Sequence, residues 1–381
     1  MPRRTQAAFV SALFAFAIVA ILSISGSSSA HLPVYQSGGP TEDTALKIPD
    51  ANVSYGITAE FTSSTNRIQF YAFSVEAGQV LDFELSVPAI SSLENFAPVV
   101  LLIGPNLPVP EGFTAELIAE FDIALASGSG ATSYLYNGTE NVNEFEPFTQ
   151  VNLWPRQKAD VTLPSQAVYY VAVAVPQGWA QDATSGFGKY VFAPGVVEKF
   201  TLRDYMAIPL DWIRWHAFWG QSVLLFMLPT FSMVIIGTPA TWYYVKKRRP
   251  EILQDKPYIS KAGFYLAIVG AMLILGSTVN QLALLFGYTK FQLATADYIE
   301  LMLQSIGLAL GILALFMSFR LMRPKSTARM IMIGILLAVI VLGALTVGAG
   351  WLVGPILFAC GGFMELLSAD KSEPTTVVSG S

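Results

Sequence analysis

The sequence predicts an all-β exported domain, an antiparallel sandwich or jelly roll, followed by a C-terminal α-helical transmembrane bundle of four or five spans. Residues 31–200 hold 18 Asp and Glu against 6 Lys and Arg, whereas residues 201–381 hold 9 against 14. Long apolar stretches are confined to the second half, with basic residues clustered between them. This contrast is typical of a soluble domain joined to a membrane domain.

The pattern divides the chain into a signal peptide at 1–30, an exported domain at 31–200, an interfacial helix at 201–216, a transmembrane bundle at 217–367 and a polar tail at 368–381. Arg3 and Arg4 precede an apolar stretch at 7–24, and small residues follow up to Ala30. This order predicts a signal peptide cleaved after Ala30; an uncleaved anchor of about 18 residues is the alternative. In either case the next segment faces outward.

Short β-type runs separated by turn residues fill the exported domain. The runs are 55–61, 68–75, 80–87, 98–103, 161–163, 169–175 and 189–192. Within 68–75 the apolar alternation slips once, which predicts a β-bulge. Short strands at this spacing, without a convincing helical stretch, predict the antiparallel sandwich or jelly roll.

Three of these runs carry a resemblance to a known family. They are Gln69-Phe-Tyr-Ala-Phe-Ser-Val-Glu-Ala-Gly-Gln-Val-Leu-Asp-Phe-Glu-Leu85, Tyr169-Tyr-Val-Ala-Val173 and Gly188-Lys-Tyr-Val191. Together they resemble the bacterial pre-peptidase C-terminal domain, in which a strand leads into an Ala-Gly-Gln turn and a late aromatic strand precedes a final Gly-x-Tyr strand. That family usually has a glycine where this chain has Ala167-Val168. The resemblance covers about a third of the chain and implies a secreted, non-catalytic accessory or binding module.

The segment 144–157 concentrates aromatic rings beside charged groups. Its candidate ligand-binding residues are Glu144, Glu146, Phe148, Trp154, Arg156 and Gln157. Rings offer stacking faces, and carboxylates and arginine offer directed hydrogen bonds, so the set can form a ligand surface. The simpler interpretation is a long inter-strand loop whose rings fill the edge of the sandwich and whose arginine pairs with a carboxylate.

Two metal hypotheses arise in the exported half. Cleavage after Ala30 would free the amino group of His31, which with its imidazole could chelate copper, although the only other histidine is His216. Calcium could use a carboxylate pair, either at 42–43 or at 144 and 146, yet no D-x-[DN]-x-[DN]-G spacing is present. A solvated acidic face is the simpler interpretation, and no cofactor is predicted from any other motif.

The motifs of common hydrolases are absent from the sequence. It contains no G-x-S-x-G and no H-E-x-x-H, and no histidine follows His31 within the exported domain to act as a base. The acidic balance also argues against nucleic acid as a partner, because phosphate binding needs clustered lysine and arginine.

The membrane half begins with a tryptophan-rich segment. Trp212, Trp215 and Trp219 recur at helical spacing, which predicts an interfacial helix with His216 seated in the same belt. The single cysteine, Cys360, is interpreted as a small buried apolar residue.

Apolar spans are expected at 217–245, 262–286 and 298–319. Basic residues at 246–249 and again at 320–329 place both loops on the cytoplasmic side of the plasma membrane. The last apolar stretch, 330–367, is too long for one span. A turn at 348–350 gives five spans and a cytoplasmic tail; without it there are four, and the tail lies outside.

A few polar side chains interrupt the spans: Asn280 and Gln281 in the second, Glu300 and Gln304 in the third, and Glu365 near the end of the last. Such groups are costly in lipid, which makes them candidates for a pathway, although contacts between helices are the simpler interpretation. No paired histidines lie within the spans, so a haem-carrying module is excluded.

Three classes of function remain. The favoured one is a non-enzymatic surface protein, anchored in the lipid bilayer, with a membrane-protein partner or a second copy of itself. The second is a transporter or channel-like subunit with an exported cap. The third is a copper-dependent redox protein or metallochaperone that uses His31.

Overall fold

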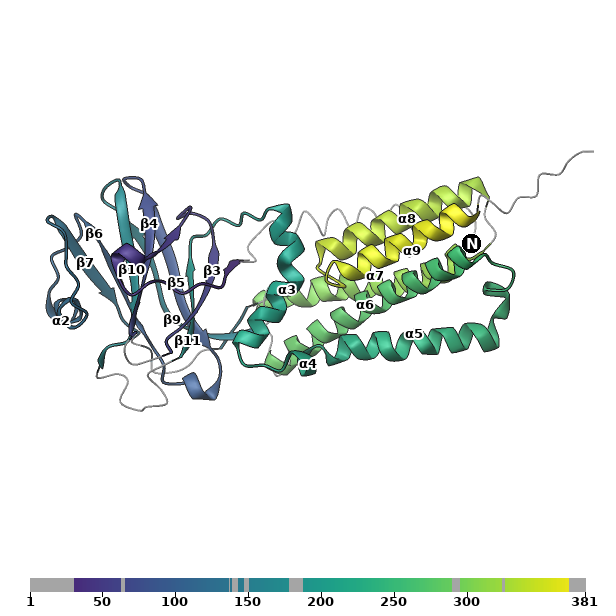
Figure 1. Ribbon diagram of the computed structural model, residues 1–381, viewed down its shortest axis with the longest axis horizontal. Coiled ribbons are helices and arrows are strands. Elements are labelled where there is room, and N and C mark those ends of the chain that lie inside the picture. The colour runs from purple at the N-terminus through teal and green to yellow at the C-terminus, as the bar shows by residue number, and fades with distance from the viewer. Residues whose placement is uncertain are drawn as a thin grey trace, which may run out of the picture. The chain divides into compact units, whose positions relative to one another are not determined.

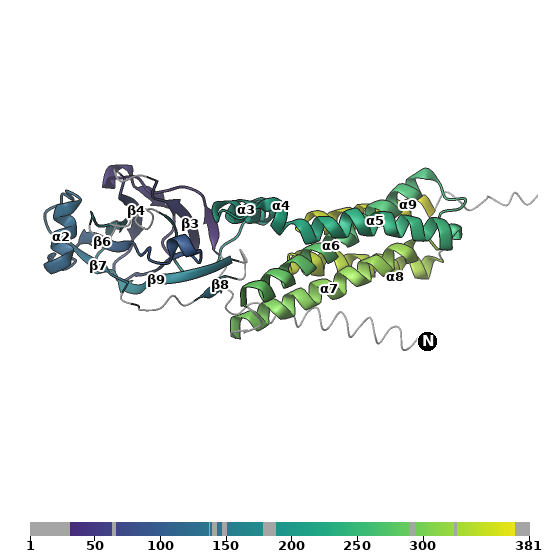
Figure 2. The ribbon, with the colours of Figure 1, turned by 90° about the horizontal axis from the view of Figure 1, so that it is seen from below.

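The computed structural model describes residues 31–62, 66–136, 138, 143–146, 151–177, 188–289, 295–323 and 326–369. The chain forms two compact units, Ser29–Ala207 and a second that includes Ile208–Ser381. We call them the β unit and the helical unit (Figures 1 and 2).

The β unit contains two mixed sheets. Sheet A has the strand order β1 (Leu32–Val34), β3 (Tyr55–Glu60), β11 (Lys189–Pro194), β5 (Val80–Pro88), β9 (Val151–Thr162) and β8 (Glu144–Glu146). Sheet B has the order β2 (Leu46–Ile48), β4 (Ile68–Val75), β10 (Ala167–Ala174), β6 (Val99–Pro105) and β7 (Ser129–Tyr134). The connections include η1 (Glu42–Thr44), η2 (Ser91–Leu93) and α2 (Gly112–Glu120).

The expectation of a purely antiparallel sandwich is wrong. β1 pairs with β3 in parallel, and β2 pairs with β4 in parallel. Both β1 and β2 are three-residue edge strands near the start of the unit. Three residues are too few to show a period of two, so the sequence does not reveal them.

Large aromatic side chains fill the space between the sheets. Tyr71 and Phe73 of sheet B meet Tyr190 and Phe192 of sheet A, and all four are fully buried. The hydroxyls of Tyr71 and Tyr190 lie 2.7 Å apart, and Tyr190 donates to Gln69 Oε1 at 2.6 Å. The two tyrosine hydroxyls and the Gln69 oxygen are therefore satisfied, as burial demands.

Strand β4 is covered on both faces. Tyr71 and Phe73 face the core, while Ile68 and Phe70 pack with Leu117 of α2 on the outer face of sheet B. The bulge predicted in β4 is wrong, because its pairing with β10 is continuous. Alternation fails here because neither face of the strand meets water. The helix α2 that provides the second cover was also not predicted.

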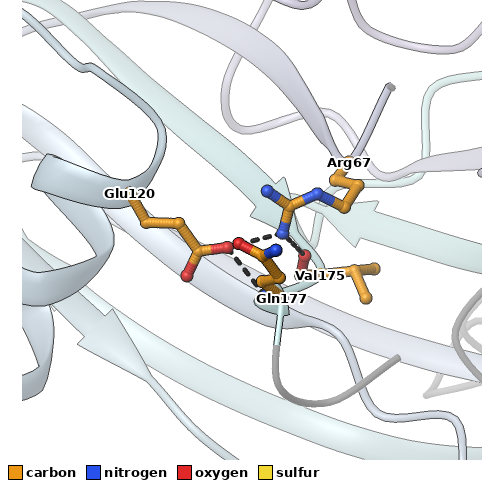
Figure 3. A network of polar contacts seen from close by, with 4 residues as sticks. All are labelled: Arg67, Glu120, Val175 and Gln177. Atoms are coloured by element: carbon orange, nitrogen blue, oxygen red, sulfur yellow. Dashed lines mark hydrogen bonds and ion pairs between the residues drawn. The ribbon is translucent and has the colours of Figure 1, made fainter. Parts of the chain in front are cut away.

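A charged network fastens the end of α2 to sheet B (Figure 3). Arg67 Nη1 lies 2.5 Å from Glu120 Oε1 and donates to the carbonyl oxygen of Val175 at 3.0 Å. The backbone N–H of Gln177 donates to the same Glu120 oxygen at 2.7 Å. One carboxylate thus joins the helix to the residues that precede β4 and follow β10.

Glu120→Ala should loosen α2, because it removes the acceptor of two charge-assisted hydrogen bonds worth about 1 kcal/mol in a partly exposed setting. Hydrogen–deuterium exchange of the α2 amides should then become faster by about fivefold. Glu116→Ala, on the exposed side of the same helix, is the matched control. Equal exchange rates in the two variants would contradict the role assigned to Glu120.

The helical unit is built from helices that follow one another along the chain. They are α3 (Leu202–Phe218), which begins in the β unit, α4 (Val223–Phe226), α5 (Leu228–Arg248), η4 (Pro250–Ile252), α6 (Tyr258–Thr289), α7 (Thr295–Leu321), α8 (Thr327–Thr346) and α9 (Val353–Ala369). Within the described ranges, Tyr258–Gly287, Glu300–Leu321 and Thr327–Thr346 are long and apolar enough to cross a membrane.

The predicted first span, 217–245, is not one helix. α3 ends at Phe218, Gly220 adopts a φ of 74°, and α5 starts only at Leu228. A glycine in this left-handed conformation terminates a helix without steric cost. Pro229 therefore stands at the start of α5, where proline is tolerated, while Pro239 lies inside it.

The last apolar stretch folds as the hairpin alternative predicted. α8 ends at Thr346 and α9 begins at Val353, with positive φ at both Gly348 and Gly350. Cys360 is exposed on α9, so its interpretation as a buried residue is wrong. Much of α8 lies on the surface of the isolated unit, as a lipid-facing helix would.

Helices α6 and α9 approach so closely that only glycine fits between them. A Cβ atom on Gly361 would lie 2.4 Å from both the Ala267 nitrogen and the Gly263 oxygen. A Cβ atom on Gly270 would lie 2.4 Å from the nitrogen of Phe358. Because lipid tails are as apolar as leucine, dispersion between closely packed backbones is what holds such helices together.

Gly361→Ala should destabilise the helical unit by about 1–3 kcal/mol, because the new methyl group meets backbone that cannot move aside. Gly334→Ala in α8 is the control, since nothing lies within 4 Å of its Cβ position. Alanine alone favours a helix by about 1 kcal/mol over glycine, so the control should be neutral or stabilising. Thermal unfolding in detergent measures the difference; a similar gain in both variants would refute the close contact.

Candidate functional site

The segment predicted as a ligand surface forms strands. Glu144 and Glu146 lie in β8, and Trp154, Arg156 and Gln157 lie in β9, whereas Phe148 lies outside the described residues. The interpretation of residues 151–157 as a loop is wrong, because β9 is a 12-residue strand paired along β5. The pairing shifts register at Arg156, because Leu85 lies opposite Gln157 and Ser86 lies opposite Pro155.

Arg156 is buried and bonds to the backbone of another segment. Its Nε donates to the carbonyl oxygen of Phe96 at 2.9 Å, and its Nη2 donates to that of Glu94 at 2.9 Å. The guanidinium carbon lies 4.7 Å from the ring centroid of Tyr136 and 5.6 Å from that of Trp154. Arg156 therefore fixes the connection between β5 and β6.

The neighbours of Arg156 are also tied into the domain. Gln157 Nε2 donates to the carbonyl oxygen of Pro98 at 2.6 Å, in the buried interior. Trp154 Nε1 donates to Asn143 Oδ1 at 2.7 Å. The structure thus brings Trp154 and Arg156 together. The hydrogen bond of Gln157 links β9 to the start of β6.

An acidic surface lies on the outer face of sheet A. The strand register sets Asp82 opposite Asp160 and Glu84 opposite Lys158. Burial, a hydrogen bond that the protonated Asp82 carboxyl donates to Asp160, and the negative charge of Asp160 raise the pKa of Asp82 to about 6. Lys158 Nζ lies 3.9 Å from Glu84 Oε2. Asp82 therefore keeps its proton to a higher pH than an ordinary aspartate does.

The other carboxylate of this surface is Glu144. Burial and the charge of Glu84 raise its pKa, while Lys158 opposes the shift. Asp82 and Glu84 are two residues apart and share one face of β5, and the register with β9 sets Asp160 beside Asp82.

His31 lies at the start of β1, with its Nδ1 2.5 Å from Ser54 Oγ. Burial, together with the charge of Lys158, lowers the pKa of His31 to about 4. Across the described part of the chain, no group of three or more His, Cys, Asp and Glu residues is placed to hold a metal ion. The copper and calcium hypotheses stay predictions, and neither gains a ligand set from the fold.

The four polar residues singled out in the second and third predicted spans are all buried in the helical unit. The exposed fractions are 1% for Asn280, 8% for Gln281, 5% for Glu300 and 3% for Gln304. Gln304 Nε2 donates to Glu300 Oε1 at 2.8 Å. The two α7 residues therefore form a pair along one helix face, four residues apart as the sequence indicated.

His216 does not occupy an exposed interfacial belt. It is fully buried, its ring stacks on Phe226 with centroids 4.1 Å apart, and its Nδ1 contacts Gln221 Oε1. Trp212 packs on Phe226 and on Trp351, with centroids 4.6 and 5.2 Å apart. These rings form an aromatic cluster that joins α3 to α4 and to the turn after α8.

A second buried carboxylate lies at the opposite end of α6. Ser260 Oγ lies 2.8 and 2.9 Å from the two carboxylate oxygens of Glu365, and both residues are 2% exposed. This contact links the start of α6 to the end of α9, next to the close glycine contacts.

Comparison with known proteins gives no assignment: no family model matches the chain, and no curated protein matches its sequence.

Asp82→Asn should stabilise the protein above pH 6. A carboxyl whose pKa is about 6 when folded and about 3.9 when unfolded favours folding at low pH and loses this contribution as pH rises through 6. Asparagine carries no charge, so it removes the cost of holding an ionised Asp82 in the folded state, and Tm at pH 7.5 should rise by roughly 1–2 °C. The difference in Tm between variant and wild type should vanish below about pH 4. Glu116→Gln, on the exposed side of α2, is the control; the same pH dependence of Tm for both variants would rule out the raised pKa of Asp82.

Proposed function

We propose that this protein is a multi-pass membrane protein whose exported β unit is a non-enzymatic binding or accessory module. The observation that carries the proposal is the division into two compact units with separate cores. The β unit closes its own aromatic core, so it can present a surface in water without help from the helices. The helical unit supplies the attachment to the lipid bilayer.

The surface of the helical unit supports attachment to a bilayer. Its exposed apolar side chains include Ile235, Ile236, Ile312, Leu342 and Phe363. Apolar side chains of this number on the outside of a helical bundle suit lipid tails better than water. The basic residues that follow α5 and α7 favour a cytoplasmic location for that end, with the β unit outside.

The resemblance to the pre-peptidase C-terminal domain supports the accessory role. The Ala-Gly-Gln turn of that family corresponds to the turn between β4 and β5, where Gly78 has a φ of 78°. The late aromatic strand and the final Gly-x-Tyr strand correspond to β10 and β11. The excess of acidic residues favours a partner with a cationic surface, in the membrane or outside it.

A second candidate function is a transporter or channel-like subunit. The observation that favours it is the burial of Asn280, Gln281, Glu300 and Gln304 within helices that suit a membrane. Buried polar groups at such positions are expensive and often belong to a pathway. An oligomer would be needed to enclose a pore of any width.

Site-directed labelling tests the proposed arrangement in intact cells. In a Cys360→Ala background, Glu116→Cys on α2 should react with a membrane-impermeant maleimide. Glu251→Cys on η4 should react only after permeabilisation. The reverse pattern would overturn the proposal. Labelling of both cysteine variants on intact cells would show that the helical unit does not span the membrane between α2 and η4.

The binding role requires its own measurement. After lysine cross-linking of intact cells with an impermeant reagent, the linked partner peptides should map to exposed lysines of the β unit such as Lys47 and Lys158. Two results together would argue against an accessory module. The lysines would react with the reagent without forming a cross-link to another protein, and the protein purified in mild detergent would be monodisperse with no second protein bound.

A further inference from the structure

The geometry points to a binding site for a monovalent alkali cation inside the helical unit, formed by side-chain oxygens of Gln281, Glu300 and Gln304 between α6 and α7. Two observations carry it. The packing of α6 on α7 sets Gln281 and Gln304 at one level of the bundle, with Glu300 one helical turn further along α7. The buried Oε1 atoms of both glutamines make no hydrogen bond. The site depends on the bundle alone, so it holds whatever the β unit binds.

The level follows from the contacts between the two helices. A Cβ atom on Gly307 would lie 2.8 Å from Thr278 Oγ1, and one on Gly311 would lie 2.7 Å from Leu275 Cδ2. Later residues of α7 therefore oppose earlier residues of α6, so the helices are antiparallel. Gln281 lies three residues after Thr278, and Gln304 lies three residues before Gly307. The two glutamines therefore lie at the same level of the antiparallel pair.

The same spacing places the residues on facing stripes. Positions three and four apart share one helix face, so Gln281 follows Thr278 on the side of α6 that meets α7. Gln304 and Glu300 extend the stripe of Gly307 on α7 toward the connection between the helices. The hydrogen bond of 2.8 Å from Gln304 Nε2 to Glu300 Oε1 keeps these two side chains together.

The unsatisfied atoms are acceptors. Gln281 Oε1 and Gln304 Oε1 are buried and have no hydrogen-bond partner within the described structure. A buried amide oxygen without a partner costs folding free energy, and two at one level cost more. A bound cation removes this cost because each oxygen gains a ligand bond.

The donor set selects the class of ion. Oxygen ligands suit hard cations, and calcium sites usually combine several carboxylates, whereas this set offers one carboxylate and two neutral amides. With one carboxylate among three oxygen ligands, the set fits a monovalent ion, sodium or potassium, better than calcium. The neighbouring Asn280 has its unpartnered atom at Nδ2, a donor, so we do not include it among the ligands.

The adjoining turn closes this end of the bundle. Ser277 Oγ accepts a hydrogen bond from the backbone N–H of Gly350 at 2.6 Å, and Ala349 packs near Gly307. Trp351 follows directly and belongs to the aromatic cluster with Trp212. Tryptophan fluorescence therefore reports on the neighbourhood of the proposed site.

Thermal unfolding of the purified full-length protein in detergent tests the site. Tryptophan fluorescence is followed in sodium chloride or potassium chloride, each compared with N-methylglucamine chloride at the same ionic strength. At least one alkali salt should raise Tm in a saturable manner, because an ion that binds only the folded state stabilises it. Binding of radiolabelled sodium or rubidium to the same preparation gives the affinity directly.

Three variants separate ligation from packing. Glu300→Gln should weaken alkali binding by at least about tenfold, as expected for the loss of the charged ligand. Gln281→Leu keeps the side-chain volume and removes an oxygen, so it keeps the test decisive if Glu300→Gln does not fold. Ser305→Ala is the control, since Ser305 is exposed on α7 and bonds to its own helix at Leu301.

Equal Tm in all three salts would overturn the site and leave water as the occupant. So would a Gln281→Leu variant that is more stable than the wild type and keeps its response to alkali ions. Ion flux is a separate measurement: binding without flux supports the site and removes the transporter candidate.

Discussion

The contact between α6 and α9 is the constraint on which the helical unit depends. Gly263, Gly270, Gly354 and Gly361 let two backbones approach to distances that no side chain permits. α6 also packs against α5 and α7, so it is the central helix of the unit. Once α9 is fixed against it, the turn at 347–352 lies beside Ser277, and the level of the polar residues on α6 is set. The site between α6 and α7 thus depends on glycines more than two turns away.

The β unit is stabilised in a different way, because burial of apolar side chains away from water holds its core together. Sheet B is covered on both faces, by sheet A on one side and by α2 on the other. Strands in the middle of such a stack are apolar on both faces and lose the alternation by which a strand is recognised. This explains why the composition of 68–75 predicts a strand correctly, whereas the slip in its alternation indicates a bulge that the pairing with β10 does not contain.

Much of the architecture follows from the sequence because the signals are local. The runs at 80–87 and 189–192 end in turn residues, and the apolar stretches of α6 and α7 exceed what a soluble helix would carry. What failed depended on distant partners. Residues 144–157 look like a loop because Arg156 and Trp154 interrupt the alternation, yet residues 151–157 pair with β5 as part of the strand β9. Arg156 resembles a ligand-binding residue until the carbonyl oxygens of Phe96 and Glu94 are seen around it. The candidate ion ligands were named by residue type alone, and their common level required the glycine contacts.

The lengths of the helices impose a further condition on the surrounding lipid. At 1.5 Å per residue, the 32 residues of α6 extend about 48 Å, whereas the 17 residues of α9 extend only about 26 Å. A hydrocarbon layer is about 30 Å thick, so the two partners in the closest contact of the unit mismatch it in opposite directions. Tilting of α6 and local thinning around α9 would relieve the mismatch. The protein would then favour thinner membranes, and the final turns of α6, with Gln281 below them, would lie near the headgroups, where ions arrive from water.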